Sequence, residues 1–207
     1  MLNQKRVVIE NVNPQLNGGS FFIKRVVGEK VTVTADVFSD GHDVVECAIR
    51  YKHEKDKNWQ ESRMVPKGND FWEGFFKVEK QGFYTYFLEG WVDYALNWQH
   101  GLERKIDDGQ YVKSELLEGA EYLKAIVERA DTNERDYLNG LIYLFTTEHE
   151  YDRAISEAKG DYLKSIFKKY PEKFLANQSS ELQVFVDREK ARFSTWYEFF
   201  PRSASRI

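Results

Sequence analysis

The 207-residue sequence lacks the features that mark several common classes of protein. It has one cysteine, Cys47, so no disulfide can form within the chain. No apolar run approaches the ~18 residues that a membrane span needs, and residues 1–6 lack the apolar region of a signal peptide. We therefore expect a cytoplasmic protein without membrane contact, in which Cys47 is a small buried thiol.

An excess of positive charge is also missing. Thirty Lys and Arg residues stand against 34 Asp and Glu, which gives a net charge of −4. A nucleic-acid-binding surface needs concentrated positive charge, so this balance argues against a nucleic-acid partner. The chain does contain 42% hydrophobic and 15% aromatic residues. That composition favours a packed core over a disordered chain.

The motifs of common catalytic and metal sites are lacking as well. The sequence has no Gly-rich phosphate loop, no Gly-x-Ser-x-Gly motif and no Cys or His cluster with metal-ligand spacing. We predict no catalytic residue, no cofactor and no metal site in this chain. His42, His53 and His149 lie in turn or polar stretches and are expected at the solvated surface. His100 lies beside aromatic residues and is either a packed histidine or a functional one.

The first hundred residues alternate between apolar and polar positions. This period of two is typical of antiparallel strands with one solvated face. Short strands separated by turn sequences favour a β-sandwich of the immunoglobulin or fibronectin type III class, in which Tyr84 and Tyr86 occupy the place of a tyrosine corner. The segments with this pattern are 31–37, 45–51, 71–78 and 83–92.

In the second half of the chain, apolar residues recur three or four positions apart, which is the period of an amphipathic helix. One helix is expected over residues 116–130. A second begins at Asp131 and Glu134, which resemble a capping pair. A third covers residues 151–166, with Gly160 as a point where it could divide.

Strand character returns at residues 182–186, so the predicted order is β, then α, then β. A helical segment that is both preceded and followed by strands is typical of an insertion in a β domain. The predicted fold class is therefore α+β. We expect a β-sandwich at residues 1–110 and 181–192 and an inserted helical bundle at residues 111–180.

Tryptophan residues offer a candidate binding surface. Trp72, Trp91 and Trp98 could stack on sugar rings, which would make the sandwich a carbohydrate-binding module. Alternatively, they fill the core, because aromatic side chains supply much of the buried area of a core. The sequence leaves both interpretations open.

Six short segments are shared, in order, with a known family. They are residues 6–14 (RVVIENVNP), 17–19 (NGG), 24–29 (KRVVGE), 36–43 (DVFSDGHD), 98–105 (WQHGLERK) and 109–110 (GQ). Together they resemble the opening of the bacterial α-1,4-glucan:maltose-1-phosphate maltosyltransferases of the α-amylase superfamily. The resemblance covers most of residues 6–120 and resumes at 182–203, while the helical middle matches mainly in layout.

The resemblance implies a β-sandwich with a helical insertion, followed by a catalytic barrel. The implied activity is a retaining transfer of maltosyl units from maltose 1-phosphate to the non-reducing end of an α-glucan. A homodimer is also implied, to which the insertion contributes, with Leu123 and Phe145 as candidate contacts. This chain would then be a non-catalytic structural and dimerisation module that braces its own catalytic barrel. The alternative is an α-glucan-binding module.

The C-terminal segment, residues 193–207, is similar to the first barrel strand of α-amylase-type enzymes. The family's nucleophilic aspartate and acid/base glutamate would lie further downstream, so no residue here takes either role. We expect this strand remnant to dock on its own chain or to pair with a second copy, and deletion of residues 194–207 followed by light scattering tests this. The residues of the remnant are Trp196, Tyr197, Glu198, Phe199, Phe200 and Arg202.

Overall fold

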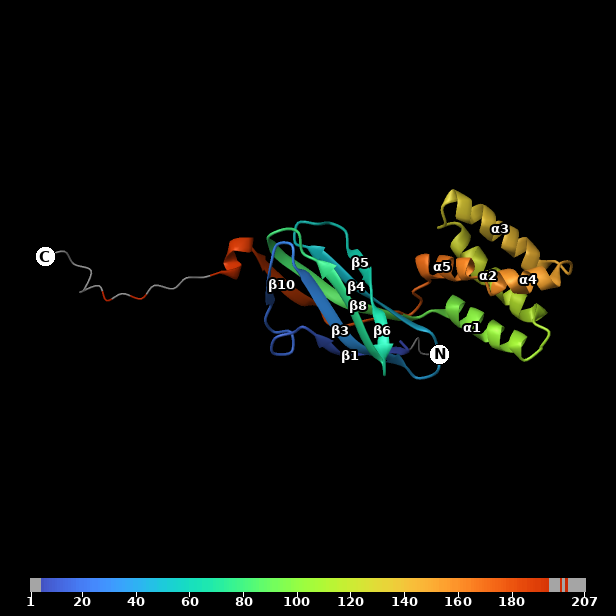
Figure 1. The fold of residues 1–207 in the computed structure, drawn as a ribbon, viewed down its shortest axis with the longest axis horizontal. Helices are drawn as coiled ribbons and strands as arrows, with labels where there is room; N and C mark the ends of the chain where they lie inside the picture. The colour runs from blue at the N-terminus through green and yellow to red at the C-terminus, as the bar shows by residue number, and fades with distance from the viewer. Residues whose placement is uncertain (1–4, 194–197, 199, 201–207) are drawn as a thin grey trace. The chain divides into compact units, whose positions relative to one another are not determined.

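The computed structural model describes residues 5–193, 198 and 200, which form a mixed fold of β-strands and α-helices (Figure 1). The chain divides into two compact units. The helical unit comprises Met1–Ile9, Val37–Cys47 and Glu89–Gln178, and the β unit comprises Glu10–Asp36, Ala48–Leu88 and Ser179–Ile207. No helix in the described ranges is long and apolar enough to cross a membrane.

The strands form two sheets. One has the order β1-β3-β7-β6, built from β1 (Val7–Asn13), β3 (Lys30–Ser39), β7 (Phe71–Lys77) and β6 (Val65–Gly68). The other has the order β2-β10-β8-β4-β5, built from β2 (Ile23–Val26), β10 (Leu182–Asp187), β8 (Gly82–Val92), β4 (Val45–His53) and β5 (Gln60–Arg63), with β9 (Asn177–Gln178) paired to β8. The predicted alternation is confirmed in β3, where Val31, Val33 and Ala35 are buried.

In the β unit, aromatic side chains join the two sheets face to face. Phe76 of β7 stacks on Tyr51 of β4 with ring centroids 4.5 Å apart, and its ring lies 5.4 Å from that of Tyr86 of β8. Gly74 of β7 permits close approach, since a Cβ there would lie 2.9 Å from Met64 and 3.1 Å from Ile49. The core of the β unit therefore lies between the sheets.

Among the described residues, the five α-helices occupy the chain between β8 and β10, which are neighbours in one sheet, and a short 3-10 helix, η1 (Glu189–Arg192), follows β10. Strand β10 pairs antiparallel with β8, where Val184 lies opposite Tyr84, and parallel with β2, where Val184 lies opposite Ile23. The chain thus leaves the sheet after β8, forms the helices and returns to the same sheet. This is the predicted order of β, α and β.

Buried apolar side chains of the five helices form one hydrophobic core, and Figure 1 shows the helices grouped together. Helices α2 and α3 correspond to the first two predicted helices, and the third predicted helix is divided at Gly160 into α4 and α5. The helices are α1 (Tyr94–Asp107), α2 (Lys113–Val127), α3 (Thr132–Thr146), α4 (Tyr151–Ala158) and α5 (Asp161–Lys169).

Helix α1 lies within the range 1–110 that the sequence assigned to the sandwich, and the apolar pattern did not predict it. Asp93 caps the helix, because its Oδ1 accepts a hydrogen bond from the N–H of Leu96 at 3.0 Å. Its inner face carries the buried Gln99, whose amide donates to the carbonyl oxygens of Ala158 at 2.9 Å and Gly160 at 3.4 Å. A polar residue inside the apolar stripe hides the helical period.

Candidate functional site

The three tryptophans of the candidate sugar platform are core residues. Trp72, Trp91 and Trp98 are buried in β7, β8 and α1 respectively. The indole N–H of Trp98 donates to the carbonyl oxygen of Glu115 at 2.6 Å. Their burial agrees with the alternative that the sequence left open, and it removes the exposed ring face that stacking on a sugar requires.

Leu123 and Phe145, the candidate dimer contacts, are fully buried in the core of the helical unit. The Phe145 ring packs against that of Trp98, with centroids 6.1 Å apart. A second copy could reach these side chains only by opening the core. Any dimer contact of this unit therefore uses other residues.

The predicted barrel-strand remnant lies mostly outside the described residues. Trp196, Tyr197, Phe199 and Arg202 belong to the part of the chain that the structure does not describe. Glu198 and Phe200 are described, exposed and outside any strand. The barrel strand stays a prediction.

His53 is buried, with 1% of its surface exposed, so the prediction that it is solvated is wrong. Its Nδ1 accepts a hydrogen bond from the N–H of Lys55 at 3.2 Å, which leaves Nε2 to donate to the carbonyl oxygen of Gln81 at 2.9 Å. The alternation of β4 carried the signal, because His53 follows the inward positions Cys47, Ile49 and Tyr51 at the same period of two. The buried thiol expected at Cys47 is confirmed.

His100 is exposed on α1, so it is not the packed histidine that one interpretation expected. It borders a small hollow of about 170 Å³. That volume is below the ~300–1,000 Å³ typical of small-molecule sites. The other residues around the hollow are Val44, Glu46, Leu96, Gln99, Glu103, Lys164 and Lys168.

A larger hollow, which we call the α3–α4 groove, encloses about 390 Å³ on the helical unit. This volume lies within the ~300–1,000 Å³ of small-molecule sites. Its residues recur three or four positions apart on each helix, so each helix turns one face toward the groove. They are Tyr137, Gly140, Leu141, Tyr143 and Leu144 on α3, and Glu150, Arg153 and Glu157 on or beside α4.

The groove is lined by both polar and apolar groups. Leu141 and Leu144 are buried and supply apolar surface, whereas the Tyr137 hydroxyl donates to Glu157 Oε2 at 3.0 Å. Burial and the neighbouring Glu157 carboxylate raise the pKa of Tyr137, so its hydroxyl keeps its proton. The Arg153 guanidinium donates to Glu150 Oε2 at 2.7 Å.

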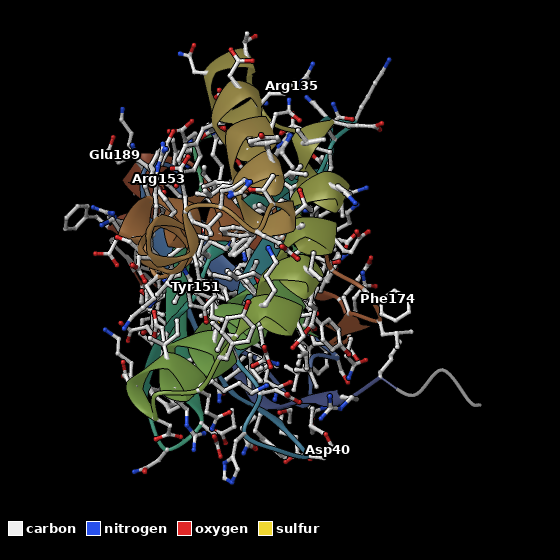
Figure 2. All side chains as sticks on the ribbon, turned by 90° about the vertical axis from the view of Figure 1, so that its right-hand side faces the viewer. Asp40, Arg135, Tyr151, Arg153, Phe174 and Glu189 are labelled. Atoms are coloured by element: carbon white, nitrogen blue, oxygen red, sulfur yellow. The ribbon has the colours of Figure 1, made fainter. Side chains whose placement is uncertain are left out.

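Tyr143, which also lines the groove, is 71% exposed. Figure 2 locates Tyr151 and Arg153 on α4. The set of rings, carboxylates and guanidinium suits binding of a polar ligand with apolar faces. Among the described residues, no group of three or more His, Cys, Asp or Glu side chains could hold a metal ion.

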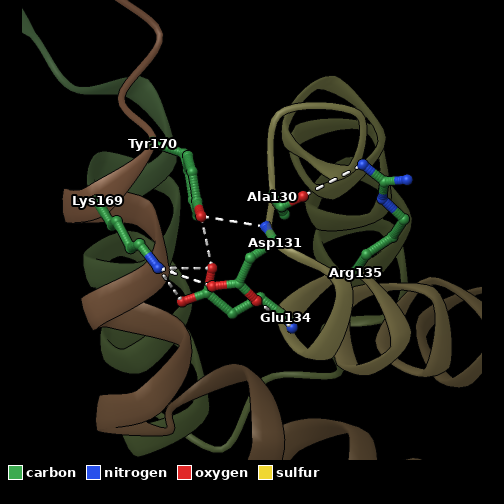
Figure 3. Close-up of polar contacts among 6 residues, drawn as sticks. All are labelled: Ala130, Asp131, Glu134, Arg135, Lys169 and Tyr170. Carbon is green, nitrogen blue, oxygen red and sulfur yellow. Dashed lines mark hydrogen bonds and ion pairs between the residues drawn. The ribbon is translucent and has the colours of Figure 1, made fainter.

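A second polar cluster ties the start of α3 to the end of α5 (Figure 3). The predicted cap is confirmed, since Asp131 Oδ1 accepts from the N–H of Glu134 at 3.0 Å. Lys169 Nζ donates to Asp131 Oδ2 at 3.0 Å and to both oxygens of Glu134 at 2.8 and 2.9 Å. Glu134 also accepts from the Tyr170 hydroxyl at 2.6 Å. The Glu134 carboxylate therefore bonds to Lys169 and Tyr170 at the end of α5, whereas in a capping box it would accept from the N–H of Asp131.

These contacts shift the pKa values of the cluster. The N–H of Glu134 and then the Lys169 ammonium lower the pKa of Asp131. The carboxylates of Glu134 and then Asp131 raise the pKa of Lys169. Both groups are charged at neutral pH, and the cluster is a clamp between two helices.

Comparison with known proteins gives one consistent result. Residues 5–188 match the family model described as alpha-1,4-glucan:maltose-1-phosphate maltosyltransferase, domain N/S. The chain is 42% identical over 208 residues to a protein of that enzyme name from Myxococcus xanthus, covering 97% of this chain and 31% of the relative.

Two further relatives carry the same name. The protein from Chlorobaculum tepidum is 36% identical, covering 98% of this chain and 30% of the relative. One from Cereibacter sphaeroides is 31% identical, covering 99% of this chain and 34% of the relative. The chain thus spans about a third of the length of the curated relatives that it matches.

Proposed function

Because this chain belongs to the alpha-1,4-glucan:maltose-1-phosphate maltosyltransferase family, as its domain N/S, we propose that it is the non-catalytic N-terminal part of such a glycosyltransferase. The observation that carries this proposal is the family match over residues 5–188 in a chain that spans about a third of its relatives. Maltosyl transfer from maltose 1-phosphate to an α-1,4-glucan needs two carboxylates that flank the reacting bond. We assign these carboxylates to the catalytic barrel, outside this chain.

Within that protein, the strands would form a sandwich of the immunoglobulin or fibronectin type III class, and the five helices a bundle inserted into it. The support is a tyrosine-corner arrangement, in which the Tyr84 hydroxyl accepts from the N–H groups of Glu79 at 3.1 Å and Lys80 at 3.0 Å. The return of the chain from α5 to β10, beside β8, supports the insertion. We propose that the module braces its own catalytic barrel in the cytoplasm.

The homodimer contact would lie on the outer surface of the helices. Leu117 of α2 is 45% exposed. Its apolar side chain would be removed from water only by contact with another surface, and that burial is favourable. Tyr111, just before α2, is also exposed and stacks on Tyr151 with ring centroids 4.9 Å apart. These apolar side chains favour a contact with a second copy.

The assay that tests the proposed function is release of inorganic phosphate from maltose 1-phosphate in the presence of maltoheptaose. We expect no release by the 207-residue chain and release by the full-length protein encoded by the same gene. The matched control is a full-length protein in which residues 5–188 are deleted, which we expect to be insoluble or much less active. Phosphate release by the 207-residue chain alone would contradict the proposal.

A further inference from the structure

We propose that the α3–α4 groove is a binding site for an uncharged α-glucan chain. The class of sugar in this inference rests on the proposed function. The place where the sugar binds is inferred from the groove. The groove is formed within the helical unit, by α3 and α4. None of the three tryptophans of the earlier candidate platform lines it.

Gly140 leaves the backbone of α3 open where it borders the groove. It lies inside α3, where glycine is among the least favourable residues. A Cβ added at this position would meet no heavy atom within 4 Å. Gly101 of α1 is equally open, so openness alone does not indicate a ligand, but at Gly140 the open backbone lies inside the groove, where a sugar can approach it closely.

The side chains around Gly140 match the chemistry of a sugar. The exposed Tyr143 ring and the apolar surface of Leu141 and Leu144 can contact the C–H faces of a pyranose ring. Sugar hydroxyls both donate and accept hydrogen bonds. They can donate to the Glu150 and Glu157 carboxylates and accept from the Arg153 guanidinium.

The charge of the groove residues distinguishes between the two sugars of the proposed reaction, an α-glucan and maltose 1-phosphate. The groove carries two carboxylates, Glu150 and Glu157, and one guanidinium, Arg153. This excess of negative charge repels a phosphate group. An unphosphorylated glucan therefore fits the groove better than maltose 1-phosphate does.

Isothermal titration calorimetry of the 207-residue chain with maltoheptaose tests the site. Gly140→Gln places a neutral side chain in the groove and replaces glycine with a good helix former. We expect it to weaken maltoheptaose binding at least about tenfold and to raise Tm by about 2–4 °C. A loss of binding in a more stable protein cannot be attributed to unfolding.

Gly101→Gln is the matched control. Gly101 also lies inside a helix, α1, with open space around its missing Cβ, but it is not a groove residue. We expect a similar rise in Tm and unchanged affinity for maltoheptaose. Tyr143→Ala, which removes an exposed ring, should weaken binding by about tenfold without lowering Tm by more than about 2 °C.

Three results would overturn the inference. The first is no binding of maltoheptaose by the unchanged chain at millimolar concentration, and the second is equal affinity in Gly140→Gln. The third is a fall in mass from dimer to monomer in Gly140→Gln without saccharide binding, which would assign the groove to a second copy. If full-length protein still transfers maltosyl units in these cases, only this inference fails and the proposed function stands. Binding of maltose 1-phosphate as tight as that of maltose would contradict the charge argument.

Discussion

The side chains of Tyr84 and His53 hold the turn at residues 79–81. The Tyr84 hydroxyl accepts from two successive N–H groups, those of Glu79 and Lys80. His53 bonds to the same turn through the carbonyl oxygen of Gln81 and packs edge-on against Tyr84, with ring centroids 5.0 Å apart. Each of these contacts gives a buried polar group a partner.

Tyr84→Phe should lower the free energy of unfolding by about 1–2 kcal/mol, because the N–H groups of Glu79 and Lys80 lose their acceptor. Urea denaturation followed by circular dichroism measures this loss. Tyr143→Phe is the control, since that side chain is largely exposed and its change should stay within about 0.5 kcal/mol. Equal effects of the two substitutions would contradict the role of the Tyr84 hydroxyl.

The Asp131 carboxylate should make stability depend on pH. Its pKa is lower in the folded chain than the unfolded value of about 3.9. Its contribution is therefore present at neutral pH and is lost as the pH falls below about 4, through the folded pKa. We expect the difference in unfolding free energy between the unchanged chain and Asp131→Asn to shrink over that range.

Lys169→Met separates the two causes of this pKa shift. The first cause is the N–H of Glu134, which this variant keeps, and the second is the Lys169 ammonium, which it removes. The loss of stability in acid should therefore persist in Lys169→Met in reduced form. If urea titrations from pH 2.5 to 7 gave identical pH profiles for Lys169→Met and the unchanged chain, the ammonium would have no part in it.

At the scale of elements, the apolar stripes of the helices meet in one core. Leu123 of α2 is fully buried, whereas Leu117 of the same helix is exposed. Leu123→Ala should cost about 2–5 kcal/mol of unfolding free energy. Lys124→Ala, at an exposed position of the same helix with a surface ion pair to Glu121, is the matched control and should change it by no more than about 0.5 kcal/mol. A small effect of Leu123→Ala would mean that the core closes around the cavity.

The sequence predicted elements well where one period ran without interruption. The alternation of β3 and the helix α3 lie where the pattern placed them, and α2 begins and ends three residues earlier than the predicted range 116–130. Prediction failed where a buried polar residue occupied an inward position. Gln99 interrupts the apolar stripe of α1, and His53 is a polar residue that occupies an inward position in the alternation of β4.

At the scale of the whole molecule, we expect a homodimer held by outer helix surfaces. Leu117→Glu should convert the dimer to a monomer, because a charged side chain at the centre of an apolar contact loses its hydration. Light scattering measures the mass, and an unchanged circular dichroism spectrum shows that the fold is intact. A monomeric unchanged chain would contradict the dimer, and an unchanged dimer in Leu117→Glu would place the contact elsewhere.

The sequence by itself determined the strand and helix periods, the order of β, α and β, and the resemblance that the family comparison confirmed. These properties depend on neighbouring residues or on short segments read in order. Only the tertiary structure decided that the tryptophans are buried, that Lys169 reaches Glu134, and that Gly140 lies in a groove with α4. Each depends on which distant segments pack together, and residue spacing along the chain does not specify that.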